Sequence, residues 1–440
     1  MSLFKKNLFG IPFWVYLAAF LPRLLLLVLA AKNPAYCVTA DSRGYLDLAA
    51  SLSGSGFFGL PAAGGAVLAD TFRTPGYPML LVAVGSLPGD IVFNAVFAQL
   101  LISALTVLLA WKWFNEMAGR RGAGFGVLFF SLDYISLMHA PLLLAEELLM
   151  LVLVLAGRAT WRTLEGGTAA GVSKAGFLWA LAAFIKPITL YLPLMLAPLL
   201  WKRKKQMFLF LLLAYSIPLA WSYRNYAHTG YFTYTSIGGV VLLKYSAGSV
   251  EALRTGKSFA ETSAALLAEA EGDYPSDAAR SSAYSARAVK IIKKYPGLTA
   301  RYLLHDLLAT VGGSGIEMLP QALGLNTEVK AQPGAIGSGT LALLRVYPAL
   351  WALQAGYLVF LAAVYLLFAR GVWVLARSGR LVPAAFLFAA VFYLFAMAST
   401  NGYYRYRIPP MLFLAAGAAI ALGREGAGQR PGHRPTTITD

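Results

Sequence analysis

Acidic and basic side chains at the ends of apolar runs are the residues of this sequence most suited to chemistry. Glu146 and Glu147 are adjacent acids at the edge of one such run. A helix N-terminus favours carboxylates, but two of them exceed that need, so we expect at least one to bind a cation or a substrate hydroxyl. Arg73 opens the turn 73–78, which contains two prolines and a glycine. A rigid turn of this kind could hold the guanidinium still for two hydrogen bonds to a phosphate, although a solvated arginine in an ordinary turn is the simpler explanation.

Three further cations stand near the same side of the expected membrane. Lys186 precedes Pro187 between two apolar runs, and Arg405 and Arg407 alternate with tyrosines just before the last run. A snorkelling lysine and an interfacial aromatic belt would explain them without a ligand. Cations in short loops on this side are few, however, and the positive-inside bias opposes them. We therefore expect an anionic ligand, such as a lipid phosphate, on this side.

Asp41 follows the first apolar run at the start of an expected helix. Tyr45, Leu48 and Leu52 continue from it at helical spacing, which predicts a helix that lies along the membrane surface. On spacing alone, the simpler role for Asp41 is to cap this helix. Asp47 points to a different helical face and is the weaker candidate for chemistry.

Other familiar catalytic patterns are missing from the sequence. It has no P-loop, no G-x-S-x-G, no H-E-x-x-H and no Cys/His cluster, which argues against ATP-driven transport by this chain. Cys37 is the single cysteine, so no intrachain disulfide can form. Arg23 and Asp133 lie inside apolar runs, where they either pair with each other or face a cavity.

These residues must be positioned by membrane helices. The 440 residues are 58% hydrophobic and 13% charged, about half the charged fraction of a soluble domain. Apolar runs of spanning length predict an all-α integral membrane protein with about ten transmembrane helices. We place these helices at about residues 8–31, 91–111, 122–138, 142–157, 173–185, 187–201, 206–222, 346–369, 381–398 and 406–422.

The distribution of basic residues predicts how the chain crosses the membrane. The net charge of +17 comes from Lys and Arg gathered in short loops, so we attribute it to the positive-inside bias and to anionic headgroups rather than to nucleic acid. With ten helices and an inside N-terminus, six basic clusters fall on the cytoplasmic side. These clusters lie at residues 5–6, 112–121, 158–174, 202–205, 370–380 and 424–434.

This topology divides the chain into six parts and puts two large loops outside the cytoplasm. The stretch from Ser258 to Tyr295 reads as helix, and 298–311 as an interfacial helix. The parts are a first transmembrane helix (1–31), a first extracytoplasmic loop with interfacial helices (32–90), transmembrane helices two to seven (91–222), a large extracytoplasmic loop (223–345), transmembrane helices eight to ten (346–423) and a cytoplasmic tail (424–440).

Taken in order, the motifs resemble those of the bacterial GT-C membrane glycosyltransferases. The likeness is greatest to the protein-mannosyltransferase-like group, which includes the lipid A aminoarabinose transferases. It covers nearly the whole chain, and although each motif is degenerate, their order and topological side are specific. The matching elements are Asp41-Ser-x-x-Tyr45, Arg73-x-Pro75-Gly76-Tyr77-Pro78, Glu146, Lys186-Pro187, Arg224-Asn225-Tyr226 and Arg405-Tyr406-Arg407-x-Pro409.

The resemblance implies roles for these residues. Asp41 matches the catalytic base or metal contact of the family, and Glu146 matches a second acid of less certain role. A divalent cation such as Mg or Mn would therefore be bound by Asp41 and Glu146. Arg73 and Lys186 match cations that serve the donor phosphate, to which we add Arg405 and Arg407. The implied substrate contacts are Tyr45, Tyr77, Glu147, Arg224 and Asn225. Asp133, where related chains often have Pro, and the lack of a clear C-terminal globular domain leave acceptor recognition open.

The implied activity is an inverting transfer of a sugar, hexosyl or pentosyl, from a polyprenyl phosphate to an extracytoplasmic lipid, glycan or protein. The enzyme would lie in the bacterial inner membrane with its active site outside the cytoplasm, in contact with membrane lipids and without nucleic acid. A flippase or transporter of lipid-linked sugars is the alternative from another class. Such a protein would show internal repeats and interrupted helices at mid-membrane, and neither is apparent in this sequence. A polysaccharide polymerase or ligase is a third interpretation.

Overall fold

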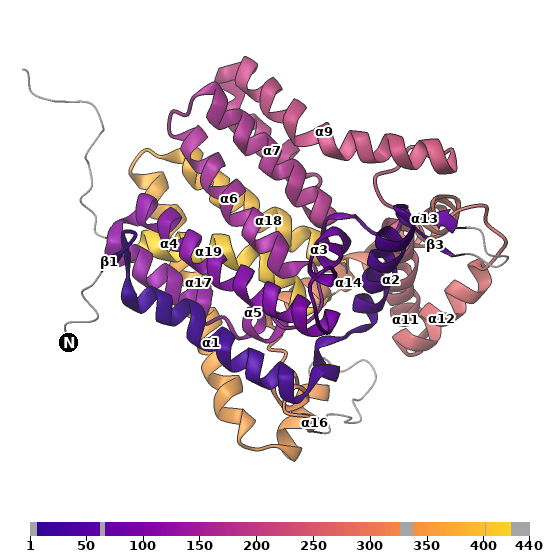
Figure 1. The fold of residues 1–440 in the computed structure, drawn as a ribbon. Helices are drawn as coiled ribbons and strands as arrows, with labels where there is room; N and C mark the ends of the chain where they lie inside the picture. Colours follow the sequence, from indigo (N-terminus) through magenta and orange to yellow (C-terminus); the bar gives the residue numbers. More distant parts are fainter. Residues whose placement is uncertain (1–6, 62–66, 326–337, 401, 424–440) are drawn as a thin grey trace, which may run out of the picture.

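The computed structural model describes residues 7–61, 67–325, 338–400 and 402–423 (Figure 1). Within these ranges the regular secondary structure is helical apart from two small antiparallel hairpins. The hairpins are β1 (Asn7–Leu8) with β2 (Ile11–Pro12), and β3 (Gly59–Pro61) with β4 (Val67–Ala69). The protein is therefore the all-α membrane protein that its composition predicts.

Five described helices are long and apolar enough to cross a membrane. They are Phe13–Lys32, Ile91–Ser131, Pro187–Thr229, Leu350–Arg377 and Leu381–Ala398. Two shorter apolar helices are α3 (Gly76–Gly85) and α7 (Ala169–Ile185). The number of ten crossings remains a prediction.

The longest helix, α4 (Ile91–Ser131), is a hairpin of two helical arms. Gly119 has φ +68°, a left-handed conformation that glycine adopts without steric cost and that breaks the helix there. A Cβ on Gly126 would lie 2.8 Å from the ring of Phe114, although twelve residues separate the two. In a straight helix twelve residues span about 18 Å. The arms before and after Gly119 therefore run back alongside each other, as the separate predicted helices at 91–111 and 122–138 require.

The last helix, α19 (Ile408–Leu422), forms the centre of the bundle, and nearly all of its side chains are buried. It packs against α4, α6 (Glu146–Leu164), α17 (Leu350–Arg377) and α18 (Leu381–Ala398). Gly371 of α17 faces the Gly417 carbonyl so closely that a Cβ there would overlap it. Two small residues thus allow these helix backbones to approach, as in many membrane bundles.

A second group of helices packs beside this centre. Helix α7 packs between α6 and α9 (Lys204–Thr229). It ends at Ile185, and Lys186 is extended with φ −150°, so the chain leaves the helix directly before Pro187. Short helical turns connect α7 to α9: η3 (Pro187–Thr189), α8 (Leu192–Leu196) and η4 (Ala197–Arg203).

One end of the bundle gathers basic residues from separate clusters. Glu116 accepts hydrogen bonds from Arg158 and Arg162, and Arg380 pairs with Glu165 at 2.7 Å. The predicted clusters at 112–121, 158–174 and 370–380 therefore lie together, and the Arg203 guanidinium reaches the Thr163 carbonyl at the same end. Residues 5–6 and 424–440 lie outside the described residues.

Helices from both segments that are predicted to be extracytoplasmic lie on one side of the molecule (Figure 1). Figure 1 shows α2, α3 and the α11–α13 helices on the side of the molecule away from the β1 hairpin. The remaining elements are α1 (Phe13–Lys32), η2 (Pro34–Cys37), α2 (Ala40–Ser55), α5 (Tyr134–His139), α10 (Ile237–Val240), the π-helix η5 (Val241–Ala247), α11 (Gly248–Thr255), α12 (Phe259–Ala270), α13 (Asp277–Lys294), α14 (Pro296–Gly312), α15 (Met318–Ala322), α16 (Ser338–Val346) and η6 (Tyr404–Arg407).

Two local predictions need correction. The stretch from Ser258 to Tyr295 is not one helix, because α12 ends at Ala270 and α13 begins at Asp277. Pro275 lies between them, and proline disfavours the helical conformation in the residue before it. Asp41 is not the cap of α2, because Thr39 accepts the hydrogen bond from the Ser42 amide and forms a capping box with Ser42.

Candidate active site

Asp41 lies between two arginines that are distant in sequence. Its Oδ1 accepts a hydrogen bond from Arg73 Nη2 at 2.9 Å, and its Oδ2 accepts one from Arg405 Nη1 at 2.8 Å. The capping box at Thr39 fixes the first turn of α2, and a carboxylate is favourable in that turn. The Asp41 side chain is nevertheless 40% exposed, so part of it faces solvent.

Glu146 joins the same cluster from the N-terminus of α6. Its Oε1 accepts hydrogen bonds from Lys186 Nζ at 2.6 Å and from Arg405 Nε. In contrast to Asp41, the Glu146 side chain is only 1% exposed. Its Oε2 is buried and has no hydrogen-bond partner among the described residues. Arg405 thus connects the two acids and closes a single cluster.

We call Asp41, Arg73, Glu146, Lys186 and Arg405 the ion cluster. It holds three cations and two carboxylates, so its formal charge is 3 − 2 = +1. The members come from α2, the turn before α3, the start of α6, the end of α7 and η6. The fold therefore brings together five of the predicted catalytic and phosphate-binding residues.

The turn that carries Arg73 is fastened to the loop that carries Lys186. Asp70 Oδ1 accepts the Arg73 amide hydrogen at 2.8 Å. The Thr74 hydroxyl donates to the Ile185 carbonyl at 2.9 Å, one residue before Lys186. A Cβ on Gly76 would lie 2.9 Å from the Phe184 carbonyl, so glycine allows this close approach. These contacts explain how two cations from different loops face one place.

Aromatic rings support the cations of the ion cluster. The Arg73 guanidinium lies over the Tyr45 ring, 4.6 Å from its centroid, and Tyr77 meets Tyr45 edge-on at 4.9 Å. Lys186 Nζ lies 5.6 Å from the centre of the Tyr406 ring. Cation–π contacts of this kind orient a cation without neutralising it. Tyr45 therefore touches the ion cluster, whereas Tyr77 supports it from behind.

Arg224 and Asn225 lie outside the ion cluster, near the C-terminal end of α9, where Arg224 bonds to the segment before Arg73 and Asn225 to the loop that follows α9. Arg224 donates to the carbonyls of Asp70, at 2.7 Å, and Phe58, and the Asn225 amide donates to the Thr233 and Tyr234 carbonyls. The next residues along this loop complete the attachment: the Ser236 amide donates to the Thr71 carbonyl and the Thr235 hydroxyl to the Phe72 carbonyl, each at 2.8 Å. The geometry favours a structural role for Arg224 and Asn225.

Arg407 points away from the ion cluster. It is fully buried, and it donates to the carbonyls of Thr310, Val311 and Gly313 and to the Tyr357 hydroxyl. These contacts attach η6 to the end of α14. Because its described contacts are with the protein, we do not include Arg407 among the phosphate ligands of the proposed site.

The charged residues inside the apolar runs do not pair with each other. Arg23 donates to the Ser103 hydroxyl and the Ser131 carbonyl, each at 3.2 Å, whereas Asp133 accepts from Tyr357 at 2.6 Å. Glu147 is buried beside Ser103, with Arg23 close by, and does not join the ion cluster.

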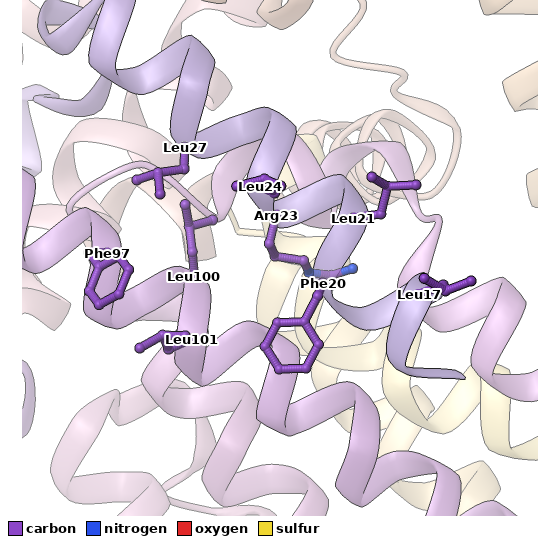
Figure 2. Close-up of a pocket in the computed structure, with 9 residues that line it drawn as sticks. All are labelled: Leu17, Phe20, Leu21, Arg23, Leu24, Leu27, Phe97, Leu100 and Leu101. Carbon is purple, nitrogen blue, oxygen red and sulfur yellow. The ribbon is translucent and has the colours of Figure 1, made fainter. Parts of the chain in front are cut away.

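Arg23 also lines a lipid-facing groove between α1 and α4. The groove has a volume of about 390 Å³, and all of its other lining residues are Leu or Phe. Figure 2 shows Arg23 behind Phe20, with Leu17, Leu21 and Leu24 along the α1 side. The prediction that Arg23 faces a cavity therefore holds, although the other lining residues offer that cavity no polar group.

The arginines keep Asp41 ionised. Burial raises the pKa of Asp41, but Arg405 and Arg73 together lower it by more than burial raises it. The pKa of Asp41 therefore lies below its ordinary value. Burial lowers the pKa of Arg73, but Tyr45 and Asp41 raise it more, so the pKa lies above its ordinary value. Both groups are therefore charged over the physiological range of pH.

Asp41 and Glu146 fit a divalent cation poorly. Three of their four carboxylate oxygens already face Arg or Lys, and the ion cluster is net positive without a metal. A divalent cation prefers several oxygen ligands. Within the described ranges, no group of three or more His, Cys, Asp or Glu side chains could hold a metal ion.

Comparison with known proteins finds a shared fold at low sequence identity. No protein-family model matches the chain, and no curated protein matches it in sequence. The Archaeoglobus fulgidus oligosaccharyltransferase tethered to an acceptor peptide matches with a TM-score of 0.51 and 12% identity, over 96% of this chain and 50% of its own. Its apo form matches with a TM-score of 0.50 and 13% identity, over 95% of this chain and 51% of its own.

ArnT from Cupriavidus metallidurans, solved with undecaprenyl phosphate, matches with a TM-score of 0.41 and 14% identity, over 93% of this chain and 78% of its own. This chain spans about half the length of the oligosaccharyltransferase. The likeness to the oligosaccharyltransferase is one of fold, and it confirms the GT-C fold that the sequence motifs predict.

Proposed function

We propose that this chain is an inverting glycosyltransferase that moves a sugar, hexosyl or pentosyl, from a polyprenyl phosphate to an extracytoplasmic acceptor. The observation that carries the proposal is the ion cluster, in which Arg73, Lys186 and Arg405 converge on Asp41 and Glu146. Three cations facing one place are suited to a phosphate that gains charge as it leaves. The GT-C fold, shared with an oligosaccharyltransferase, supports the same chemistry.

The proposed reaction is one in-line displacement. The acceptor oxygen forms a bond to the anomeric carbon of the sugar, and the bond from that carbon to the phosphate oxygen breaks. The proton of the acceptor hydroxyl goes to Asp41, and the bonding electrons leave with the polyprenyl phosphate. Arg73, Lys186 and Arg405 balance the charge of the departing phosphate. Attack opposite the leaving group inverts the anomeric centre.

Asp41 and Glu146 would have different roles in the reaction, because their side chains differ in exposure to solvent. Asp41 is 40% exposed and can meet an acceptor from solvent, whereas Glu146 is 1% exposed and can act only on a group that enters the ion cluster. Glu146 would hold Lys186 and Arg405 at the phosphate site, and its buried Oε2, which has no hydrogen-bond partner among the described residues, would accept from a hydroxyl of a sugar that enters the ion cluster. A lipid, glycan or protein acceptor would fit this arrangement.

An apolar groove near η6 is suited to the prenyl chain. It has a volume of about 450 Å³ and lies between α14, α17 and α18, with Leu304, Phe388 and Phe392 among its lining. Helices α14 and α18 both contact η6, which carries Arg405. A prenyl chain in this groove would have its phosphate end toward the ion cluster. We place the enzyme in the bacterial inner membrane, with the ion cluster on the extracytoplasmic side.

The decisive experiment measures what happens to a lipid-linked sugar. Mass spectrometry of lipids that copurify with the protein in nanodiscs would identify the donor. Incubation of that donor with cell-envelope acceptors should then release free polyprenyl phosphate. A flippase would instead return the donor intact on the other side of a vesicle membrane, and that result would overturn the proposal. Arg254→Ala, in an exposed helix of the second loop, serves as the control variant.

A further inference from the structure

Gln99 is a buried amide in the first arm of α4, surrounded by a membrane helix bundle. Its side chain is fully buried. Burying a polar group in an apolar setting is costly unless its hydrogen bonds are made, and an apolar residue would pack there without that cost. The contacts of Gln99 therefore call for an explanation.

The amide nitrogen of Gln99 holds the turn that leads to Glu146. Nε2 donates to the Leu142 carbonyl at 2.6 Å and to the Ala140 carbonyl at 3.1 Å. Both carbonyls can only accept, which fixes the orientation of the amide. The same turn is tied to the segment before Asp41, because the Leu143 amide donates to the Cys37 carbonyl at 2.8 Å.

The amide oxygen of Gln99 holds the other half of the ion cluster. It accepts a hydrogen bond from the hydroxyl of Tyr77, which is itself fully buried. The Tyr77 ring meets the Tyr45 ring at 4.9 Å, and Tyr45 lies beneath the Arg73 guanidinium at 4.6 Å. One side chain thus connects the Arg73 half to the Glu146 half.

We propose that Gln99 is a positioning residue that sets the spacing between these two halves. Through Tyr77 and Tyr45 it places Arg73, and through the turn at 140–142 it places Glu146, which in turn holds Lys186 and Arg405. The inference rests on the proposed function, because it assumes that the three cations bind one phosphate. Cations on separate loops bind a phosphate well only if their separation matches it, and a shift of about 1 Å can have a large effect.

The test compares two lipid probes that differ only in the phosphate: undecaprenyl phosphate and undecaprenol. Their affinities are measured on purified full-length protein in nanodiscs for the wild type, Gln99→Met, Tyr77→Phe and the double variant. We expect Gln99→Met to reduce the ratio of the two affinities about tenfold, since it removes three hydrogen bonds. Tyr77→Phe should reduce the ratio less, and the double variant should match Gln99→Met, because both changes remove one shared hydrogen bond.

The control is Thr106→Val, a nearly isosteric change in the same arm of α4. Thr106 is also buried, but within the described part of the chain its hydroxyl donates to the Ile102 carbonyl of its own helix and to no other group. In Thr106→Val the ratio of the two lipid affinities should stay within about twofold of the wild-type ratio. A fall in this ratio as large as that of Gln99→Met would refute the inference. If Gln99→Met loses affinity equally for undecaprenyl phosphate and for undecaprenol, the role of Gln99 is purely structural, and this result would also refute the inference. If Gln99→Met does not fold, an unchanged ratio in Tyr77→Phe refutes the inference instead. A wild type that does not prefer undecaprenyl phosphate would overturn the proposed function rather than the role of Gln99.

Discussion

Asp41 and Glu146 carry the same functional group, yet their surroundings give them different properties. Asp41 faces solvent with part of its side chain and shares its two oxygens between Arg73 and Arg405. Glu146 is closed off, with one oxygen on Lys186 and Arg405 and the other without a partner among the described residues. In the proposed reaction this difference in accessibility favours Asp41 as the proton acceptor and Glu146 as the group that places the cations.

We expect Asp41→Asn to abolish most turnover while it preserves donor-phosphate binding. The amide cannot accept the proton of the acceptor, and a positioned base is worth roughly a hundredfold to ten-thousandfold in rate. Removing the carboxylate also frees Arg73 and Arg405, so affinity for undecaprenyl phosphate should hold or rise. Single-turnover transfer and lipid affinity, measured on one preparation, separate the two effects. Wild-type turnover in this variant would remove Asp41 from the mechanism.

Substitutions of Arg73 test whether the cations of the ion cluster bind phosphate through directed hydrogen bonds. Arg73→Ala should weaken undecaprenyl phosphate binding about tenfold to a hundredfold, because a hydrogen bond to a charged group is lost. Arg73→Lys should recover only part of this, since a point charge lacks the planar fork of arginine. Arg254→Ala, an exposed arginine of α11, is the matched control. Equal affinities in all of these variants would place the phosphate elsewhere.

The pKa of Asp41 gives a prediction for the pH dependence. In the free protein the two arginines hold this pKa below its ordinary value. A bound phosphate would draw Arg73 and Arg405 away, so the pKa should rise in the complex. Because kcat/KM reports the free enzyme and kcat the complex, the acid limb of kcat should lie at higher pH than that of kcat/KM. Acid limbs of kcat and kcat/KM at one common pH would contradict this assignment.

The sequence predicts the types of residue in the site better than their contacts. Asp41, Arg73, Glu146, Lys186 and Arg405 stand out because charge near a membrane is costly and needs a purpose. Gln99 carries no charge, so it gives no such signal although it is fully buried. The contacts of Arg407 depend on the carbonyls at the end of α14, more than ninety residues away, which spacing along the chain cannot reveal.

At the scale of elements, hydrophobic runs predict the helices but not how the chain turns between them. The end of α7 at Ile185, directly before Lys186-Pro187, follows from proline chemistry. The division between α12 and α13 and the capping of α2 by Thr39 depend on local hydrogen bonds and backbone choices. A prediction from helix-favouring composition alone joins α12 and α13 into one helix.

The hairpin at Gly119 gives a prediction about stability. Gly119→Ala should destabilise the protein by about 1 kcal/mol, because a Cβ is unfavourable at φ +68°. Among the described residues, no atom beyond the neighbouring backbone lies within 4 Å of the position that this Cβ would take, so the cost comes from the local backbone conformation. The control is Gly297→Ala, at an equally open glycine of α14 without a positive φ. Thermal unfolding in detergent should show a loss for Gly119→Ala and none for Gly297→Ala.

At the scale of the whole molecule, the two ends of the bundle differ in their charged residues. Helix α6 begins at Glu146 in the ion cluster and ends at Leu164, close to Arg162 and to the Glu165–Arg380 ion pair, so about 28 Å separate its two ends. That length is close to the apolar thickness of a bilayer. The ion cluster and the gathered basic residues would therefore lie at opposite membrane surfaces.

This arrangement gives a prediction about orientation in the membrane. The positive-inside bias places the basic end in the cytoplasm, which puts Lys205 inside and Asp273, in the loop between α12 and α13, outside. Both positions are exposed and suit cysteine labelling in a background in which the buried Cys37 is replaced by alanine. That replacement leaves the Cys37 carbonyl in place for its hydrogen bond from Leu143. A membrane-impermeant maleimide added to intact spheroplasts should label Asp273→Cys at once, and Lys205→Cys only after the membrane is opened. The reverse pattern would turn the ion cluster toward the cytoplasm, where an extracytoplasmic acceptor could not reach Asp41. Labelling of both positions from outside would instead mean that the number of crossings between them differs from the one that the apolar runs predict.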